Sequence, residues 1–352
     1  MKNSLLYITA LICIIFLESW VTPVTQTLQP GMQPQVSIDT KGMIRVVFGR
    51  NDSIFCATST DNGLSFSDSR LVGHVKGMHL GMTRGPQLAS SRTVSLVTAM
   101  DKSGDIHFFQ LNHLTNKWVK KGFVNDARSS APEGLMGIAA DEADNFYAVW
   151  LDLRGNKQNN IYYSSLTAAE TKWSKNRLVY KSPDSHVCEC CKPSIAVKNK
   201  TVAIMFRNWV DGARDLYVLQ SMDKGRSFDT AQKMGMGTWK LKGCPMDGGG
   251  LAFDSKGNIQ TTWQRQGIIY TAKPGENEVK ISAGRGSTIA SSTITDRIII
   301  SYHDGENGKV VNAKDNKEIL SVKGTALKPL LLSNGKIFCV WEQNKTVMFS
   351  SL

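Results

Sequence analysis

The sequence lacks any long segment with helical periodicity, and beyond its N-terminal region it lacks any apolar run long enough to span a bilayer. These absences argue against an all-α fold and against a helical membrane span. No motif combines basic and aromatic residues as known nucleic-acid-binding modules do. We therefore expect no nucleic-acid partner, and we also expect no cofactor and no bound metal.

The N-terminal region is the one markedly apolar segment. Lys2 precedes an apolar run from Leu5 to Leu17, which is short for a membrane helix but typical of a secretion signal. Cys13 lacks the small residue that usually precedes a lipoprotein cysteine, which argues against a lipid anchor. The sequence predicts a removed signal peptide over residues 1–26, a single domain over residues 27–352, and export to the periplasm or the extracellular space.

Charge and cysteine content narrow the environment and the ligand. The net charge is +12, which suits an anionic ligand such as a carboxylated sugar, a sulfated glycan or a nucleic acid without choosing between them. Six of the seven cysteines follow the predicted signal peptide, and an even number in an exported protein favours disulfides. The sequence leaves the oligomeric state open.

The rest of the chain is a repeat of short apolar or alternating runs separated by Gly, Asn and Asp turns. Four short strands per unit predict an all-β fold, a single β-propeller of four-stranded antiparallel blades. The last unit lacks a fourth strand, which the segment "TLQPGMQ" after the signal peptide could supply to close the ring. A six-bladed ring is the alternative if the weak unit at 287 is not a blade. Seven units can be counted, beginning near residues 34, 85, 133, 192, 249, 287 and 328.

Two units carry a sharper motif between their third and fourth strands: "STDNGLSF" at 59–66 and "SMDKGRSF" at 221–228. Both match Ser-x-Asp-x-Gly-x-x-Phe/Trp, in which Ser and Asp can bond the turn backbone, Gly takes a positive φ and the aromatic packs between strands. This is the Asp-box, or BNR repeat, and here the chain resembles the sialidase (neuraminidase) superfamily over nearly all of its length. Because the motif is structural, Asp61 and Asp223 are poor catalytic candidates.

A propeller divides its loops between two faces. If the first strand of each blade lines the channel, the links between blades and the turns between second and third strands share one face. These loops contain arginines, carboxylates, aromatics and glycines, as in "HLGMTRGP", "CECCKP", "KGCPMDGG", "WLDLRGNKQNN" and "RNWVDGARD". Propeller ligands usually bind at such a mouth, so we expect the functional site there.

The resemblance implies a specific chemistry. Sialidases hold the substrate carboxylate with three arginines, use a tyrosine nucleophile activated by a glutamate, and use an aspartate as acid/base; tyrosine is a recognised exception among glycosidases. Arg84 in "RGP" looks like the first arginine, although Gly85 replaces the family's isoleucine. The remaining candidates are Arg207 and Arg265 for the carboxylate, Tyr302 as nucleophile, Asp101 as acid/base, and Glu133 or Glu189 as the partner of the tyrosine.

Further polar residues fall in the same loops without matching the sialidase scheme. They are candidates for substrate binding, or for salt bridges that hold the loops together. The glycines of "MDGGG" either let the backbone approach a ligand closely or allow crowding at the ring centre. The polar set is Asp152, Arg154, Asp211, Arg214, Asp215 and Asp247.

Three functions follow from these residues. The first is a secreted sialidase-like glycoside hydrolase acting on terminal sialic acid or a related acidic sugar. The second is a non-catalytic propeller that binds a glycan or a protein through the same mouth, which scattered arginines would favour over an assembled triad. The third is a metal or redox protein built on Cys188, Cys190, Cys191 and Cys244, although C-x-C-C is not a usual zinc spacing and export favours oxidation.

The repeat also suggests how the cysteines pair. "CECCKPSIAV" and "GCPMDGGGLAF" each precede the first strand of successive blades, so Cys244 should lie near Cys188, Cys190 and Cys191. We expect a disulfide between Cys244 and one of those three. Cys56 and Cys339 form a second candidate pair, since the first and last blades are neighbours in a closed ring.

Overall fold

The computed structural model describes residues 25–154 and 157–352, and within them all regular structure is β. The predicted signal peptide lies outside the described residues except at its end, where Gln26 already belongs to the first strand. No helix in the described part of the chain is long and apolar enough to cross a membrane.

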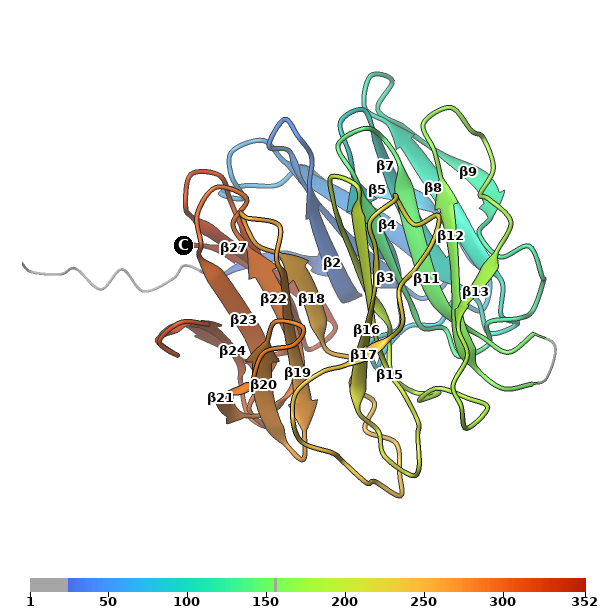
Figure 1. Ribbon diagram of the computed structural model, residues 1–352. Coiled ribbons are helices and arrows are strands. Elements are labelled where there is room, and N and C mark those ends of the chain that lie inside the picture. Colours follow the sequence, from blue (N-terminus) through green and yellow to red (C-terminus); the bar gives the residue numbers. More distant parts are fainter. Residues whose placement is uncertain (1–24, 155–156) are drawn as a thin grey trace, which may run out of the picture.

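The strands form seven four-stranded antiparallel sheets, one for each predicted unit (Figure 1). Blade 1 contains β2 (Met32–Ile38), β3 (Ile44–Arg50), β4 (Ser53–Ser59) and β5 (Arg70–His74). Blade 2 contains β6 (Gln87–Ser90), β7 (Val94–Met100), β8 (Ile106–Asn112) and β9 (Lys117–Phe123). Blade 3 contains β10 (Met136–Ala140), β11 (Phe146–Asp152), β12 (Asn160–Leu166) and β13 (Arg177–Tyr180).

The remaining blades repeat the same order. Blade 4 contains β14 (Ser194–Lys198), β15 (Thr201–Arg207), β16 (Leu216–Ser221) and β17 (Gln232–Lys233). Blade 5 contains β18 (Gly250–Phe253), β19 (Ile259–Arg265), β20 (Ile268–Ala272) and β21 (Val279–Ala283). Blade 6 contains β22 (Arg285–Ser291), β23 (Ile298–His303), β24 (Gly308–Asn312) and β25 (Glu318–Val322). The unit at 287 is therefore a complete blade, and the six-bladed alternative is wrong.

Blade 7 joins the two ends of the chain. It contains β26 (Thr325–Leu331), β27 (Ile337–Gln343) and β28 (Thr346–Ser351), and its fourth strand is β1 (Gln26–Pro30). β1 pairs antiparallel with β28, and Gly31 N donates to the carbonyl oxygen of Lys345 at 2.8 Å. The predicted closure by the segment after the signal peptide is confirmed, and in Figure 1 blue β2 lies beside orange-red β27.

Each blade buries both of its faces against its neighbours, which explains why the second strands read as continuous apolar runs. In β27, Phe338 and Val340 pack against blade 1, in a cluster with Val46 of β3. The alternate residues Cys339 and Trp341 face blade 6 instead. The core of the protein is thus the set of apolar layers between successive blades.

This alternation overturns the predicted pair of Cys56 and Cys339. Both cysteines are buried free thiols. Cys56 on β4 faces blade 2, where it packs near Val97 and Phe109, whereas Cys339 faces blade 6. Their blades are neighbours, but each side chain points to the far side of its own blade.

The two Ser-x-Asp turns have the contacts expected of them. Ser59 Oγ donates to Asp61 Oδ1 at 2.7 Å, and Asp61 Oδ1 accepts the backbone N–H of Ser65 at 3.0 Å. The hydrogen bonds from the Ser65 hydroxyl, the Ser59 hydroxyl and the Ser65 backbone N–H, in that order of size, lower the pKa of Asp61 to about 2. Gly63 has φ +80°, and a Cβ there would lie 2.3 Å from the ring of Phe338.

The aromatic that ends each turn packs on the preceding blade. Phe66 lies 5.5 Å from Phe338 and 4.9 Å from Phe349 of blade 7, measured between ring centroids. Phe228 lies 5.2 Å from Tyr163 of blade 3 in the same way. The turns therefore fasten blades together, on the face opposite the links.

Candidate functional site

The links between blades contact the turns between second and third strands, so the predicted common face exists. His79 N in the first link donates to Met100 O at 2.9 Å, and Leu153 N donates to Ser130 O at 2.9 Å. Cys188 N donates to Arg207 O at 3.0 Å. We call this face the mouth.

The mouth half of the channel is hollow. A cavity of about 710 Å³ lies between the first halves of the inner strands and the links that lead into them. This volume falls in the range of small-molecule sites. Its ionisable lining residues are Lys192, Asp247, Arg285, Tyr302, His303 and Lys328.

Two lysines face this cavity from different blades. Lys192 begins the approach to β14, and Lys328 lies in β26. Lys192 Nζ donates to the side-chain oxygen of Gln87, whose amide nitrogen is held by the carbonyl oxygens of Gly85 at 3.0 Å and Pro86 at 3.1 Å. Burial, and then the charge of Lys328, lower the pKa of Lys192 to about 7. Burial lowers the pKa of Lys328 to about 8, although Asp247 opposes the effect.

Neither lysine is among the residues predicted from the sequence. The available signal is that each stands before a proline at the start of an inner strand, in "KPSIAV" and "KPLLL". A charged residue at that position is directed into the channel once the ring has closed. Gln87, Arg285 and His303, which also line the cavity, were not predicted either.

Among the described residues Asp247 is the one carboxylate that lines the cavity, and backbone groups hold it. Its Oδ2 accepts the N–H of Gly286 at 2.7 Å and its Oδ1 accepts that of Gly249 at 3.3 Å. A Cβ on the neighbouring Gly248 would lie 1.8 Å from the carbonyl oxygen of Lys192. The glycines of "MDGGG" therefore allow crowding at the ring centre.

Arg207 and Arg265 lie together in a crevice between blades 4 and 5, where both guanidinium groups are engaged. Arg207 is fully buried, and its Nε, Nη1 and Nη2 donate to the carbonyl oxygens of Asp247 (2.8 Å), Arg214 (2.6 Å) and Gln264 (2.9 Å). Arg265 forms a bidentate ion pair with Glu278, with Nη1 to Oε2 at 2.7 Å. Neither arginine is among the residues that line the channel cavity.

Arg84 belongs to a separate cluster with the two candidate glutamates. Its Nε donates to the carbonyl oxygen of Glu133 at 2.5 Å, and its Nη2 lies 3.7 Å from Glu133 Oε2. Burial raises the pKa of Glu133, Arg84 opposes the rise and Glu189 adds to it. Glu189 is half exposed, with its Oε1 4.0 Å from His186 Nδ1. The structure thus brings Arg84, Glu133 and Glu189 together, but not with Arg207 and Arg265.

The other two catalytic candidates lie in different settings. Tyr302 on β23 is buried, lines the channel cavity and packs with Ile269 of blade 5. Asp101 lies in a turn, where its Oδ1 accepts a hydrogen bond from the backbone N–H of Ser103 at 2.9 Å. The ring Nε2 of His107 lies 2.8 Å from its Oδ2. Burial acts to raise the pKa of Asp101, but these hydrogen bonds outweigh it and hold the pKa below its usual range.

Most of the additional polar set forms ion pairs that hold the loops. Asp152 is fully buried and receives Arg154 Nη2 at 2.7 Å, while Arg154 Nη1 pairs with Asp126 at 2.5 Å. Asp215 Oδ2 lies 3.0 Å from Lys233 Nζ. Asp211 is exposed and lies 3.5 Å from Lys240.

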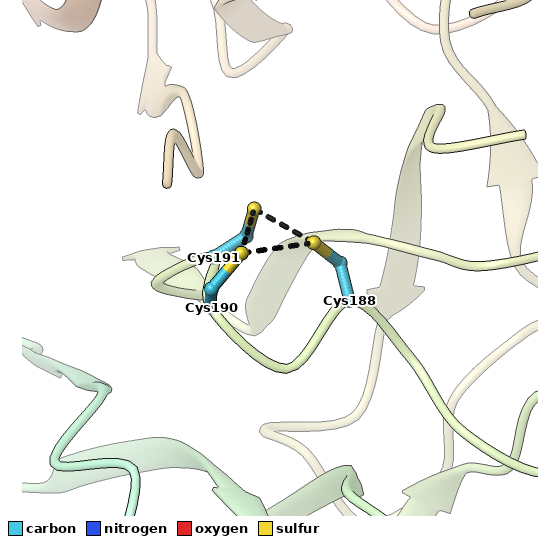
Figure 2. A group of neighbouring side chains, drawn as sticks. All are labelled: Cys188, Cys190 and Cys191. Atoms are coloured by element: carbon cyan, nitrogen blue, oxygen red, sulfur yellow. Dashed lines mark hydrogen bonds between the residues drawn. The ribbon is translucent and has the colours of Figure 1, made fainter. Parts of the chain in front are cut away.

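The cysteine segment forms the predicted disulfide with Cys244. Cys190 forms a disulfide with Cys244, with a Cα–Cα distance of 6.3 Å, which joins the link of blades 3 and 4 to that of blades 4 and 5. Cys188 and Cys191 are buried free thiols whose sulfur atoms lie 2.9 Å apart (Figure 2). Arg214 Nη1 lies 3.1 Å from Cys188 Sγ. The hydrogen bond between Cys188 and Cys191, with the charges of Arg214 and Arg207, lowers the pKa of Cys188 to about 6 against the effect of burial.

Comparison with known proteins supports the fold. No protein-family model and no curated protein sequence matches the chain. Among solved structures, the BP39L lectin from Burkholderia pseudomallei matches with a TM-score of 0.65 and 11% identity over 92% of this chain and 96% of its own. The polysaccharide lyase PL25 ulvan lyase bound to -[GlcA(1-4)Rha3S]- matches with a TM-score of 0.61 and 8% identity over 93% of this chain and 95% of its own.

The fold is also shared with proteins of a different kind. The WD40 repeats of RRP9 match with a TM-score of 0.57 and 11% identity over 93% of this chain and 96% of that one. At such identities the similarity shows the propeller fold alone. Structural neighbours thus include glycan-binding and glycan-cleaving propellers, and the resemblance to sialidases stays a prediction carried by the two motif turns.

Proposed function

We propose that the protein binds an acidic glycan in the mouth half of its channel, through Lys192 and Lys328. The observation that carries this proposal is the charge of the cavity wall. Lys192, Arg285 and Lys328 line it together with one carboxylate, that of Asp247, which already accepts two backbone N–H groups. A carboxylate or sulfate would add counter-charge for the two lysines beyond that of Asp247.

Two structural neighbours give this proposal a precedent. One is a lectin, and the other was solved with a bound sugar that carries glucuronate and sulfate groups. Binding fits the arginine positions better than hydrolysis does, because Arg207 and Arg265 already donate to protein acceptors. We also propose that the protein is exported to an oxidising compartment, with which the Cys190–Cys244 disulfide is compatible.

Titration calorimetry with a glucuronate-containing oligosaccharide, a sialyl oligosaccharide and a neutral oligosaccharide of the same length tests the proposal. Loss of one charged hydrogen bond is worth about 1.5–3 kcal/mol, so Lys192→Met and Lys328→Met should each weaken binding of the acidic sugars roughly 10- to 100-fold. Lys256→Met is the matched control, because Lys256 is exposed, pairs with Asp296 and does not line the cavity. Equal affinity for acidic and neutral sugars would contradict the proposal.

A second candidate is hydrolysis of a terminal acidic sugar, with Tyr302 as the nucleophile. The observation in its favour is that Tyr302 lines the same cavity as the two lysines. A fluorogenic sialoside tests it directly. Turnover that disappears in Tyr302→Phe while sugar binding remains would establish the hydrolase, and no turnover by folded protein that binds the sugar would leave binding as the function.

A further inference from the structure

Four cysteines of the mouth converge on one point from two links. The sulfur atoms of Cys188, Cys190 and Cys191 lie within 4.8 Å of one another, with separations of 2.9, 3.7 and 3.9 Å (Figure 2). Cys244 is bonded to Cys190, so a fourth sulfur atom lies at the same place. Elsewhere in residues 25–154 and 157–352, no three His, Cys, Asp or Glu side chains converge as closely.

The surroundings suit sulfur anions and exclude large reactants. Arg214 Nη1 lies 3.1 Å from Cys188 Sγ, and the buried Arg207 adds a second positive charge nearby. Cys188 and Cys191 have almost no exposed surface, at 0% and 1%. A protein or sugar cannot reach these two thiols, and the exposed member of the cluster is Cys244.

We propose that Cys188, Cys190, Cys191 and Cys244 bind one soft d¹⁰ cation, Zn²⁺ or Cu⁺, when the Cys190–Cys244 disulfide is reduced. Four sulfur ligands complete the tetrahedral shell of a closed structural site, and thiolates select these cations. The two arginines offset the negative charge that such a shell carries.

The chemistry is a reduction followed by exchange of protons for metal. A dithiol such as dithiothreitol gives two electrons and two protons to the S–S bond of Cys190 and Cys244, and is itself oxidised to a disulfide. The thiols then release protons as their sulfur atoms bind the cation. The ion replaces the disulfide as the connection between the two links, and so keeps Lys192, the residue after Cys191, at the channel wall.

Metal content measures this directly. The experiment uses the full chain with Cys13→Ala, so that only the six other cysteines contribute. The protein is reduced with dithiothreitol, and the dithiothreitol is removed under nitrogen. Zn²⁺ or Cu⁺ is then added to separate samples. After desalting we expect about one ion per chain in the reduced protein and at least roughly tenfold less in the oxidised protein. Cys188→Ala and Cys191→Ala should lose the ion, and the matched control Cys56→Ala/Cys339→Ala should keep it.

A second measurement needs no variant that risks misfolding. Cys244 is exposed, so once reduced it should react with iodoacetamide, and the bound ion should slow that reaction at least roughly tenfold. Peptide mass mapping gives the rate at Cys244 itself. Reduced protein with native circular dichroism that binds neither ion, or that binds one as well after Cys188→Ala, would overturn the proposal.

Discussion

Arg207 and Asp247 are joined by a hydrogen bond of 2.8 Å from the guanidinium Nε to the backbone carbonyl oxygen. The bond ties the end of β15 to the link that enters β18, beside the carboxylate that lines the channel. The same guanidinium also donates to Arg214 O and Gln264 O. Arg207 therefore organises three backbone segments around the mouth.

We expect Arg207→Met to destabilise the protein strongly. Each buried carbonyl oxygen left without a donor costs about 1–3 kcal/mol, so with partial relaxation the free energy of unfolding should fall by about 3–5 kcal/mol. Urea denaturation measures it. Arg70→Met is the control, since Arg70 is exposed on β5 and should change stability by no more than about 0.5 kcal/mol. A small effect at Arg207 would mean that water replaces its donors.

Acidic-sugar binding should weaken as the pH rises through 7 and 8. The pKa values of Lys192 and Lys328 are lowered to about 7 and about 8, first by burial, so the ammonium groups that attract the ligand are lost in this range. Calorimetry at about pH 6 and about pH 9 should show the difference. Lys192→Met/Lys328→Met should abolish the pH dependence, and an unchanged dependence would assign it to other groups.

The free energy of unfolding of the ligand-free protein should instead rise with pH. Because both lysines have lowered pKa values in the folded state, the unfolded chain binds more protons between pH 7 and its ordinary lysine pKa of 10.5. The two lysines therefore contribute a rise in the free energy of unfolding as the pH increases across that window. Comparing wild type with Lys192→Met/Lys328→Met by urea denaturation isolates this contribution.

Gly248→Ala should impair both stability and binding. Its Cβ would lie 1.8 Å from the carbonyl oxygen of Lys192, so the backbone before β14 must move and carry the lysine with it. Overpacking of this kind costs about 1–3 kcal/mol, and the affinity for acidic sugar should fall too. Gly308→Ala is the control at the same cavity, where the closest atom is a Leu327 methyl at 3.3 Å. Equal behaviour of the two variants would mean that Lys192 tolerates displacement.

A chain that begins at Met32 should be less stable than one that begins at Thr25. The shorter chain lacks β1, which removes the ladder to β28 and the contacts of Leu28 with the layer between blades 7 and 1. We expect a loss of about 3 kcal/mol or more and association through the exposed edge of β28. Thermal unfolding and analytical ultracentrifugation measure the two effects, and identical, monomeric behaviour of both chains would contradict the prediction.

The fold was predictable from the sequence because its signals are local. Turn residues separate the strands, and alternation over a few residues defines each blade, so even the closure of blade 7 could be inferred. The pair of Cys56 and Cys339 was wrong because the ring order is visible in the repeat, whereas the face each residue takes depends on exact register.

The site was less predictable because its contacts are not local. The mouth face followed from the repeat, as did a disulfide to Cys244. The partners of Arg207 did not, since its acceptors Asp247 and Gln264 come from distant segments that only packing brings together. Lys192 and Lys328 look like ordinary surface lysines until the ring encloses them.

From the pairing of β1 with β28 we also expect an order of folding. Blades 1 to 6, and strands β26–β28 of blade 7, consist of consecutive strands and can form as local units, whereas β1 can join β28 only when both ends of the chain meet. Closing that contact spans nearly the whole chain, so it is the slowest kind of pairing in the molecule. Until it forms, the ring is open and its last sheet has an unprotected edge, which makes the interval before closure the period of greatest exposure to proteolysis and aggregation.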